Sequence, residues 1–155
     1  MALFPLAPTD ASFLFKGRVD VSGTRPSLQW PQTSVSVQLD CPMRAVATFR
    51  FTSAEKHSTW RLLLDGASNA SQPAGAGSTK LSMRVPPGSH TLELLKDSEC
   101  LRCSPAMHAP PFHPIAGQPE TFDGLSVSDP NCRPSRPTRQ QRRVEVVGDS
   151  IACGF

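Results

Sequence analysis

The 155-residue sequence contains no tyrosine, and its aromatic residues make up only 6% of the chain. A ligand surface built mainly from stacked aromatic rings is therefore not expected. No apolar run is long enough to span a membrane, and residues 1–15 lack the basic start and the uninterrupted apolar run of a signal peptide, so neither feature is indicated. The net charge of +3 is too small by itself to indicate nucleic-acid binding. These observations leave the compartment open.

Sustained helical periodicity is also missing between residues 15 and 130, where apolar and polar residues alternate instead. A period of two turns one face of a strand inward. It occurs in six stretches, at residues 34–39, 45–51, 60–64, 81–85, 91–94 and 122–127. Short strands separated by turn signals such as Asp65-Gly66 predict an all-β jelly roll or β-sandwich over residues 13–130. Residues 67–79 and the proline-rich residues 104–119 are predicted to be loops.

The cysteines give a weak signal. Five cysteines cannot all pair with one another, and Cys100 and Cys103 form a lone CxxC motif. Because no second pair follows at zinc spacing, we interpret this motif as small thiols at a strand end, free or disulfide-bonded, rather than a zinc or redox site. No metal or cofactor is expected.

Residues 131–143 differ in composition from the rest of the chain. They contain five arginines, no acidic residue and two prolines, which is typical of a stiff, solvated linker. A nucleic-acid-binding arm is the alternative, because clustered arginines neutralise phosphates. No aromatic residues interleave with these arginines, so the linker is the favoured interpretation.

A β-branched stretch at residues 144–147 then leads into Gly148-Asp149-Ser150. A serine nucleophile needs a base to take its proton and backbone N–H groups to hold the oxyanion. A strand that turns at glycine into a helix beginning at Ser150 would supply such N–H groups. The same residues could simply cap a helix, and on this stretch alone both interpretations stand. Ala152 excludes the Gly-x-Ser-x-Gly elbow.

Several motifs occur together in a particular order. They are FKGRVD at 15–20, PSLQWP at 26–31 with TSVSVQ at 33–38, LLDG at 63–66, GSHTLELLK at 88–96 with Glu99 after it, and VEVVGDSIACGF at 144–155. Together they resemble carbohydrate esterase family 2, a group of SGNH (GDSL-type) hydrolases. The first four resemble its N-terminal jelly-roll domain and the last resembles the first block of its hydrolase domain. The chain departs from the family at Gln32, usually glycine, at Ala152, usually threonine, and at Phe155, usually tyrosine.

The resemblance implies an esterase that removes acetyl groups from polysaccharides such as xylan. Ser150 takes the position of the nucleophile, and its own backbone N–H takes one oxyanion position. The remaining donors, a glycine and an asparagine, and the histidine base belong to later blocks. Residues 144–155 are thus expected to be the start of a truncated α/β hydrolase domain. The implied partners are an acetylated polysaccharide and the missing C-terminal catalytic domain, with no nucleic acid and no membrane.

The four histidines, His57, His90, His108 and His113, all precede the linker, and none is expected to reach Ser150. Loss of the histidine base costs about a million-fold in kcat in another serine hydrolase, so the 155 residues are expected to be inactive alone. The alternative function is a non-catalytic carbohydrate-binding module, since jelly rolls commonly bind sugars. Of the two tryptophans, Trp60 is predicted to lie in the core and Trp30 nearer an edge.

Overall fold

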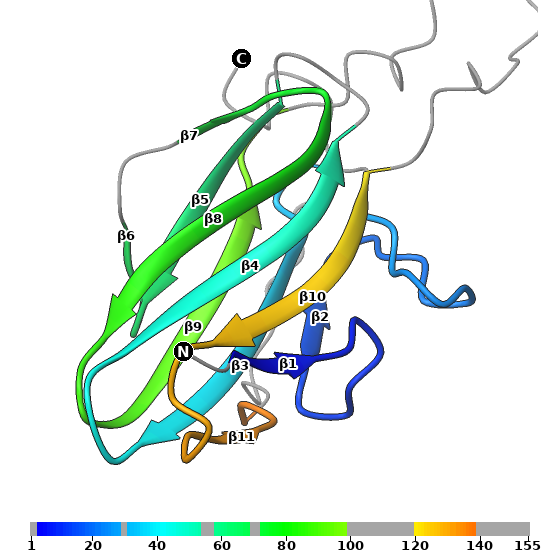
Figure 1. Ribbon diagram of the computed structural model, residues 1–155. Coiled ribbons are helices and arrows are strands. Elements are labelled where there is room, and N and C mark those ends of the chain that lie inside the picture. The colour runs from blue at the N-terminus through cyan, green and yellow to red at the C-terminus, as the bar shows by residue number, and fades with distance from the viewer. Residues whose placement is uncertain (1–2, 29–30, 54–57, 69–71, 99–119, 139–155) are drawn as a thin grey trace, which may run out of the picture.

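A computed structural model of the chain describes residues 3–28, 31–53, 58–68, 72–98 and 120–138. These residues form eleven strands and no helix, arranged as two packed antiparallel sheets (Figure 1). The predicted all-β sandwich is therefore confirmed. Within the described residues there is no helix long and apolar enough to cross a membrane.

The front sheet, nearer the viewer in Figure 1, has four strands. Their order across the sheet is β1 (Phe4–Leu6), β10 (Thr121–Val127), β4 (Ala45–Ser53) and β8 (Gly77–Val85). The rear sheet has the order β11 (Arg133–Ser135), β3 (Ser34–Cys41), β9 (Gly88–Lys96), β5 (Ser58–Leu64) and β6 (Ala67–Ser68). Two further strands extend it, because β2 (Leu14–Lys16) pairs with β3 and β7 (Gln72–Ala74) pairs with β5.

Alternating residues of both sheets fill the space between them. All six predicted strands are present, and their inward side chains are buried, apart from Leu64, which is partly buried. The largest fully buried apolar side chains are Trp60, Phe49, Phe51, Phe122, Leu28, Leu39, Leu62, Leu92, Leu94, Leu125 and Val35. The Asp65-Gly66 turn between β5 and β6 has φ of 52° and 81° at its two residues, the left-handed conformation that two-residue hairpins need.

Two features differ from the sequence prediction. Residues 67–79, predicted to be a loop, contain β6, β7 and the first residues of β8. These short polar strands pair through the backbone and show no apolar alternation. On the outer face of β3, Ser34 and Ser36 are buried rather than solvated: the Ser34 hydroxyl donates to Glu93 and the Ser36 hydroxyl to the Leu14 carbonyl.

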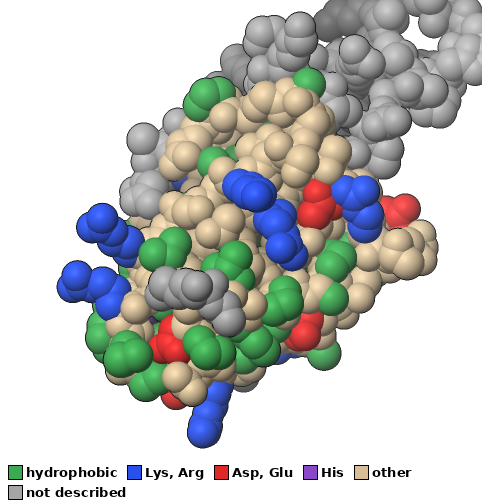
Figure 2. Space-filling model, in the orientation of Figure 1, with side chains coloured by type: hydrophobic (Ala, Val, Ile, Leu, Met, Phe, Trp, Pro, Cys, Tyr) green, Lys and Arg blue, Asp and Glu red, His purple; other side chains and the backbone are tan. Residues whose placement is uncertain are grey.

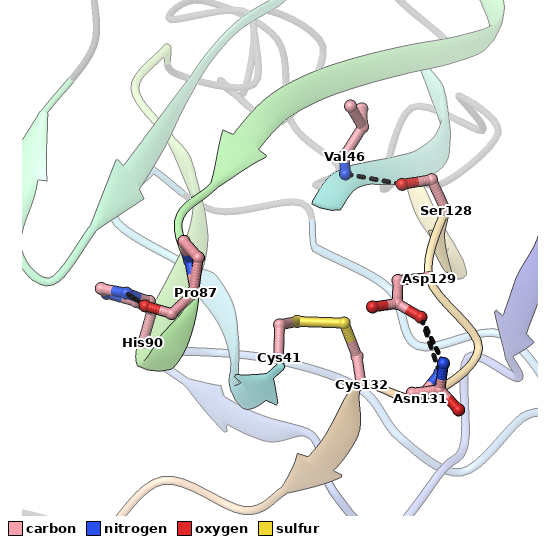
Figure 3. Close-up of a disulfide and its surroundings, with 8 residues drawn as sticks. All are labelled: Cys41, Val46, Pro87, His90, Ser128, Asp129, Asn131 and Cys132. Atoms are coloured by element: carbon pink, nitrogen blue, oxygen red, sulfur yellow. Dashed lines mark hydrogen bonds between the residues drawn. A yellow bond between two sulfur atoms is a disulfide. The ribbon is translucent and has the colours of Figure 1, made fainter. Parts of the chain in front are cut away.

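The sandwich includes paired residues on both sides of the predicted 13–130 range, since β1 pairs with β10 and β11 pairs with β3. A disulfide between Cys41, at the end of β3, and Cys132, just before β11, secures this last strand (Figure 3). It closes a loop of 91 residues, and in the chain-entropy model a loop of that length contributes about 4.6 kcal/mol to stability. Cys100 and Cys103 lie outside the described residues.

Candidate functional site

A buried polar cluster closes one end of the sandwich, where β4 and β9 end and β10 begins. The Lys96 ammonium lies 2.9 Å from Oε2 of Glu120, and the two side chains are 0% and 5% exposed. The Ser53 hydroxyl donates to the other Glu120 oxygen at 2.8 Å. Lys96 belongs to the rear sheet, whereas Ser53 ends β4 of the front sheet and Glu120 immediately precedes β10. The cluster therefore links the front sheet to the rear sheet through an ion pair and a hydrogen bond.

Neighbouring residues separate this cluster from solvent. The Leu28 backbone N–H donates to the Glu120 carbonyl at 2.8 Å. Trp60 lies opposite Lys96 in the ladder of β5 and β9, is fully buried, and packs on Phe51 with ring centroids 4.5 Å apart. The core position predicted for Trp60 is thus confirmed. Its indole N–H finds no acceptor among the described residues. The opposite charges of the cluster balance and the cluster is closed to solvent. We therefore interpret it as a structural joint between the two sheets, not as a reactive site.

Two of the motif stretches meet beside this joint. The Gln32 N–H donates to the Lys96 carbonyl at 2.9 Å, and Gln32 has a φ of 61°. Gly17, with φ of +83°, packs so closely that a Cβ there would lie 3.0 Å from Thr33 Cγ2. A left-handed φ favours glycine. The left-handed φ at position 32 would therefore suit glycine better than glutamine.

Another pair of motif residues lies at the opposite end of β9. His90 Nδ1 is 2.7 Å from Asp65 Oδ2, its Nε2 is 3.3 Å from the Pro87 carbonyl, and Asp65 Oδ1 accepts the Thr91 N–H at 2.8 Å. The hydrogen bond to Asp65 raises the pKa of His90, against a smaller opposing effect of desolvation. The hydrogen bonds from His90 and Thr91 lower the pKa of Asp65.

Among the described residues, the contacts of His90 are those of a structural side chain. Both ring nitrogens face oxygen acceptors, and no hydroxyl of the described residues is hydrogen-bonded to the ring. The pair instead fixes the β5–β6 turn against β9. The described residues also contain no group of three or more histidine, cysteine, aspartate or glutamate side chains able to hold a metal ion.

The predicted nucleophile, Ser150, and its backbone N–H lie outside the described residues. The same holds for His57, His108, His113 and Trp30. Sequence reasoning missed Glu120, which pairs with Lys96, and Ser53, which donates to Glu120. No local pattern marks them, because each is tens of residues away from Lys96 along the chain.

Comparison with known proteins identifies a family and a fold. Residues 15–108 match the family described as carbohydrate esterase 2 N-terminal. No curated protein sequence matches the chain. A family two carbohydrate esterase from Clostridium thermocellum, solved with cellohexaose, superposes with a TM-score of 0.66 at 20% identity. One from Cellvibrio japonicus gives a TM-score of 0.65 at 18% identity.

These superpositions cover 92% and 99% of this chain but only 39% and 41% of the two esterase chains. A family 35 carbohydrate-binding module from Cellvibrio japonicus Abf62 also superposes, with a TM-score of 0.58 at 15% identity, over 87% of this chain and 99% of the module. At such identities the structural matches show the jelly-roll fold. The family match covers well over half of the chain, and the chain therefore belongs to the carbohydrate esterase 2 N-terminal family.

Proposed function

We propose that this chain supplies the N-terminal accessory domain of a carbohydrate esterase that removes acetyl groups from polysaccharides. The family match over residues 15–108 carries the proposal. Gly148-Asp149-Ser150, which follows the sandwich after an arginine-rich stretch, supports it as the first block of a hydrolase domain.

In the proposed reaction the Ser150 hydroxyl attacks the acetyl carbonyl and its own N–H donates to the resulting oxyanion. A serine hydroxyl is a weak nucleophile until a base takes its proton. His90 is already held by Asp65 and Pro87. The base, and the further oxyanion donors, would come from hydrolase blocks beyond these 155 residues. We accordingly propose that the 155 residues alone do not hydrolyse esters.

The test compares two proteins: the 155-residue chain, and a longer product in which the sequence continues through a hydrolase domain. Acetate release from acetylated xylan is measured for each, with and without Ser150→Ala. We expect release only from the longer protein, and loss of about a million-fold on substitution. Acetate release by the 155 residues that is lost on Ser150→Ala would contradict their proposed inactivity. Acetate release by the longer protein that is unchanged by Ser150→Ala would contradict the proposed serine esterase mechanism.

A second candidate function is carbohydrate binding without chemistry. It is favoured by the superposition over 99% of an isolated family 35 carbohydrate-binding module, since the described sandwich needs no further layer to make that fold. Binding of the 155-residue chain to a glycan array, unchanged by Ser150→Ala, would support this function.

A further inference from the structure

The outer face of the front sheet carries an excess of positive charge over β4 and β8. Side chains of directly opposed residues point to the same side of a sheet. The outward pairs are Val46 with Arg84, Thr48 with Ser82, Arg50 with Lys80, and Thr52 with Ser78. Figure 2, which views this face, shows a group of lysine and arginine side chains near its middle, with other basic side chains at its margins and several acidic side chains on the same face.

The cations of this face are incompletely neutralised. Its one engaged carboxylate, Asp123, accepts from Arg25 and from the Thr52 hydroxyl, while Arg50 reaches only the Asp123 backbone carbonyl, at 3.5 Å. Lys80 and Arg84 are exposed, and no carboxylate of the described residues lies within ion-pair distance of either one. Arg25, Arg50, Lys80 and Arg84 thus outnumber Asp123, the carboxylate that is hydrogen-bonded among them.

Like charges placed directly opposite each other in a sheet are unfavourable. Arg50 and Lys80 occupy such a position, so an anionic group between them would relieve the repulsion. Lys80 and Arg84 are four residues apart on one strand, about 13 Å at the usual rise of ~3.3 Å per residue. An extended polymer with repeated anionic groups can pair with both side chains along the strand.

The hydroxyls between these cations suit a sugar chain. Thr48 and Ser82 are hydrogen-bonded to each other at 2.8 Å, and hydroxyls retain capacity for further donors and acceptors. No outward residue of β4 or β8 is aromatic, so stacking on a neutral sugar is not provided for. A polysaccharide that bears carboxylates would supply anionic groups for these cations and hydroxyl groups for Thr48 and Ser82.

We propose that the outer face of β4 and β8 binds a polysaccharide bearing carboxylate groups, with Arg50, Lys80 and Arg84 pairing with its carboxylates. This surface lies on the sandwich itself and its role does not depend on the proposed esterase reaction.

The test is binding of the 155-residue protein to immobilised polygalacturonate, with neutral hydroxyethyl cellulose as the comparison. Lys80→Gln with Arg84→Gln removes two unpaired surface charges and keeps the aliphatic stems. Because each exposed ion pair contributes only modestly to binding, the dissociation constant should rise about tenfold when both are lost. Added salt should also raise the dissociation constant of the parent protein for polygalacturonate.

Arg133→Gln with Arg136→Gln is the matched control, because it removes two exposed arginines next to the rear sheet that also lack an ion-pair partner among the described residues. It should change the dissociation constant by less than about twofold. An equal loss in this control would overturn the proposal, since binding would then follow net charge alone. Failure to bind polygalacturonate, or equal binding to duplex DNA with the same dependence on Lys80 and Arg84, would overturn it as well.

Discussion

Lys96 and Glu120 form an ion pair 2.9 Å long between the two sheets, and both side chains are almost completely withdrawn from solvent. Removing one member of a buried pair leaves the other charge uncompensated, which is much more costly than removing both. The stability of the sandwich should therefore depend on the match between these two residues more than on the presence of either.

Glu120→Gln is predicted to lower the free energy of unfolding by about 3–5 kcal/mol, because the Lys96 ammonium stays buried without its carboxylate. Urea unfolding measures the change. The double variant Lys96→Met with Glu120→Gln removes both charges while an amide oxygen remains for the Ser53 hydroxyl. It should recover more than half of the loss, and a double variant less stable than Glu120→Gln would contradict the account.

Gln32→Gly is predicted to stabilise the protein. A non-glycine residue in the left-handed region costs ~1–2 kcal/mol, and the extra freedom of glycine in the unfolded chain offsets about 0.5–1 kcal/mol of the gain. Gln32→Val should destabilise, because a β-branched residue is least tolerated at a φ of 61°. Melting temperatures that rank the variants in the opposite order would show that position 32 is unstrained.

Gly124→Ala should be strongly destabilising. Gly124 lies at the irregularity in the pairing of β10 with β4, and a Cβ there would come within 2.4 Å of the Leu6 carbonyl oxygen. Gly77 offers a control, because its φ of +101° is close to the +104° of Gly124 but nothing lies within 4 Å of its Cβ position. Both alanine variants have the strain of a positive φ. Gly124→Ala should therefore lower the free energy of unfolding by ~1–3 kcal/mol more than Gly77→Ala, because of the steric clash. Equal losses in chemical denaturation would exclude the clash.

The contact of His90 with Asp65 predicts a pH-dependent contribution to stability. The pKa of His90 is raised, so its contribution is complete below the unfolded value of about 6.5 and is lost as pH rises through the folded pKa. The pKa of Asp65 is lowered, so its contribution is complete above about 3.8 and is lost as pH falls through the folded pKa. The pair therefore contributes most between these two unfolded values.

His90→Gln should accordingly destabilise the protein more at pH 5.5 than at pH 9. Urea unfolding of the parent and the variant at both pH values gives the comparison. A loss of equal size at the two pH values would mean that the imidazole stabilises the β5–β6 turn without its charge.

The sequence was sufficient for the parts of the fold that depend on local pattern. Alternation predicted six strands, and Asp65-Gly66 predicted a tight turn that the structure confirms. Pairing over long distances along the chain leaves no such local trace. The Cys41–Cys132 disulfide and the Lys96–Glu120 pair each join segments that the sequence keeps far apart, and β1, β2 and β11 are too short to show a period.

The candidate catalytic residue illustrates a different limit. Ser150 was singled out by a motif and by what a nucleophile requires, and it lies outside the described residues. His90, by contrast, is described, and its hydrogen bonds assign it a structural role that no spacing rule could supply. Its role follows from a register in which Asp65 of one turn faces Thr91 of β9.

The most direct test of the central claim is to read the transcript across the codon for Phe155. If this chain supplies the accessory domain of a carbohydrate esterase, the frame continues into a Gly-x-Asn-Asp block and a late Asp-x-x-His block that supply the missing oxyanion donors and the base. A stop codon after Phe155, or a continuation without these blocks, would contradict the esterase and leave carbohydrate binding as the function of the sandwich.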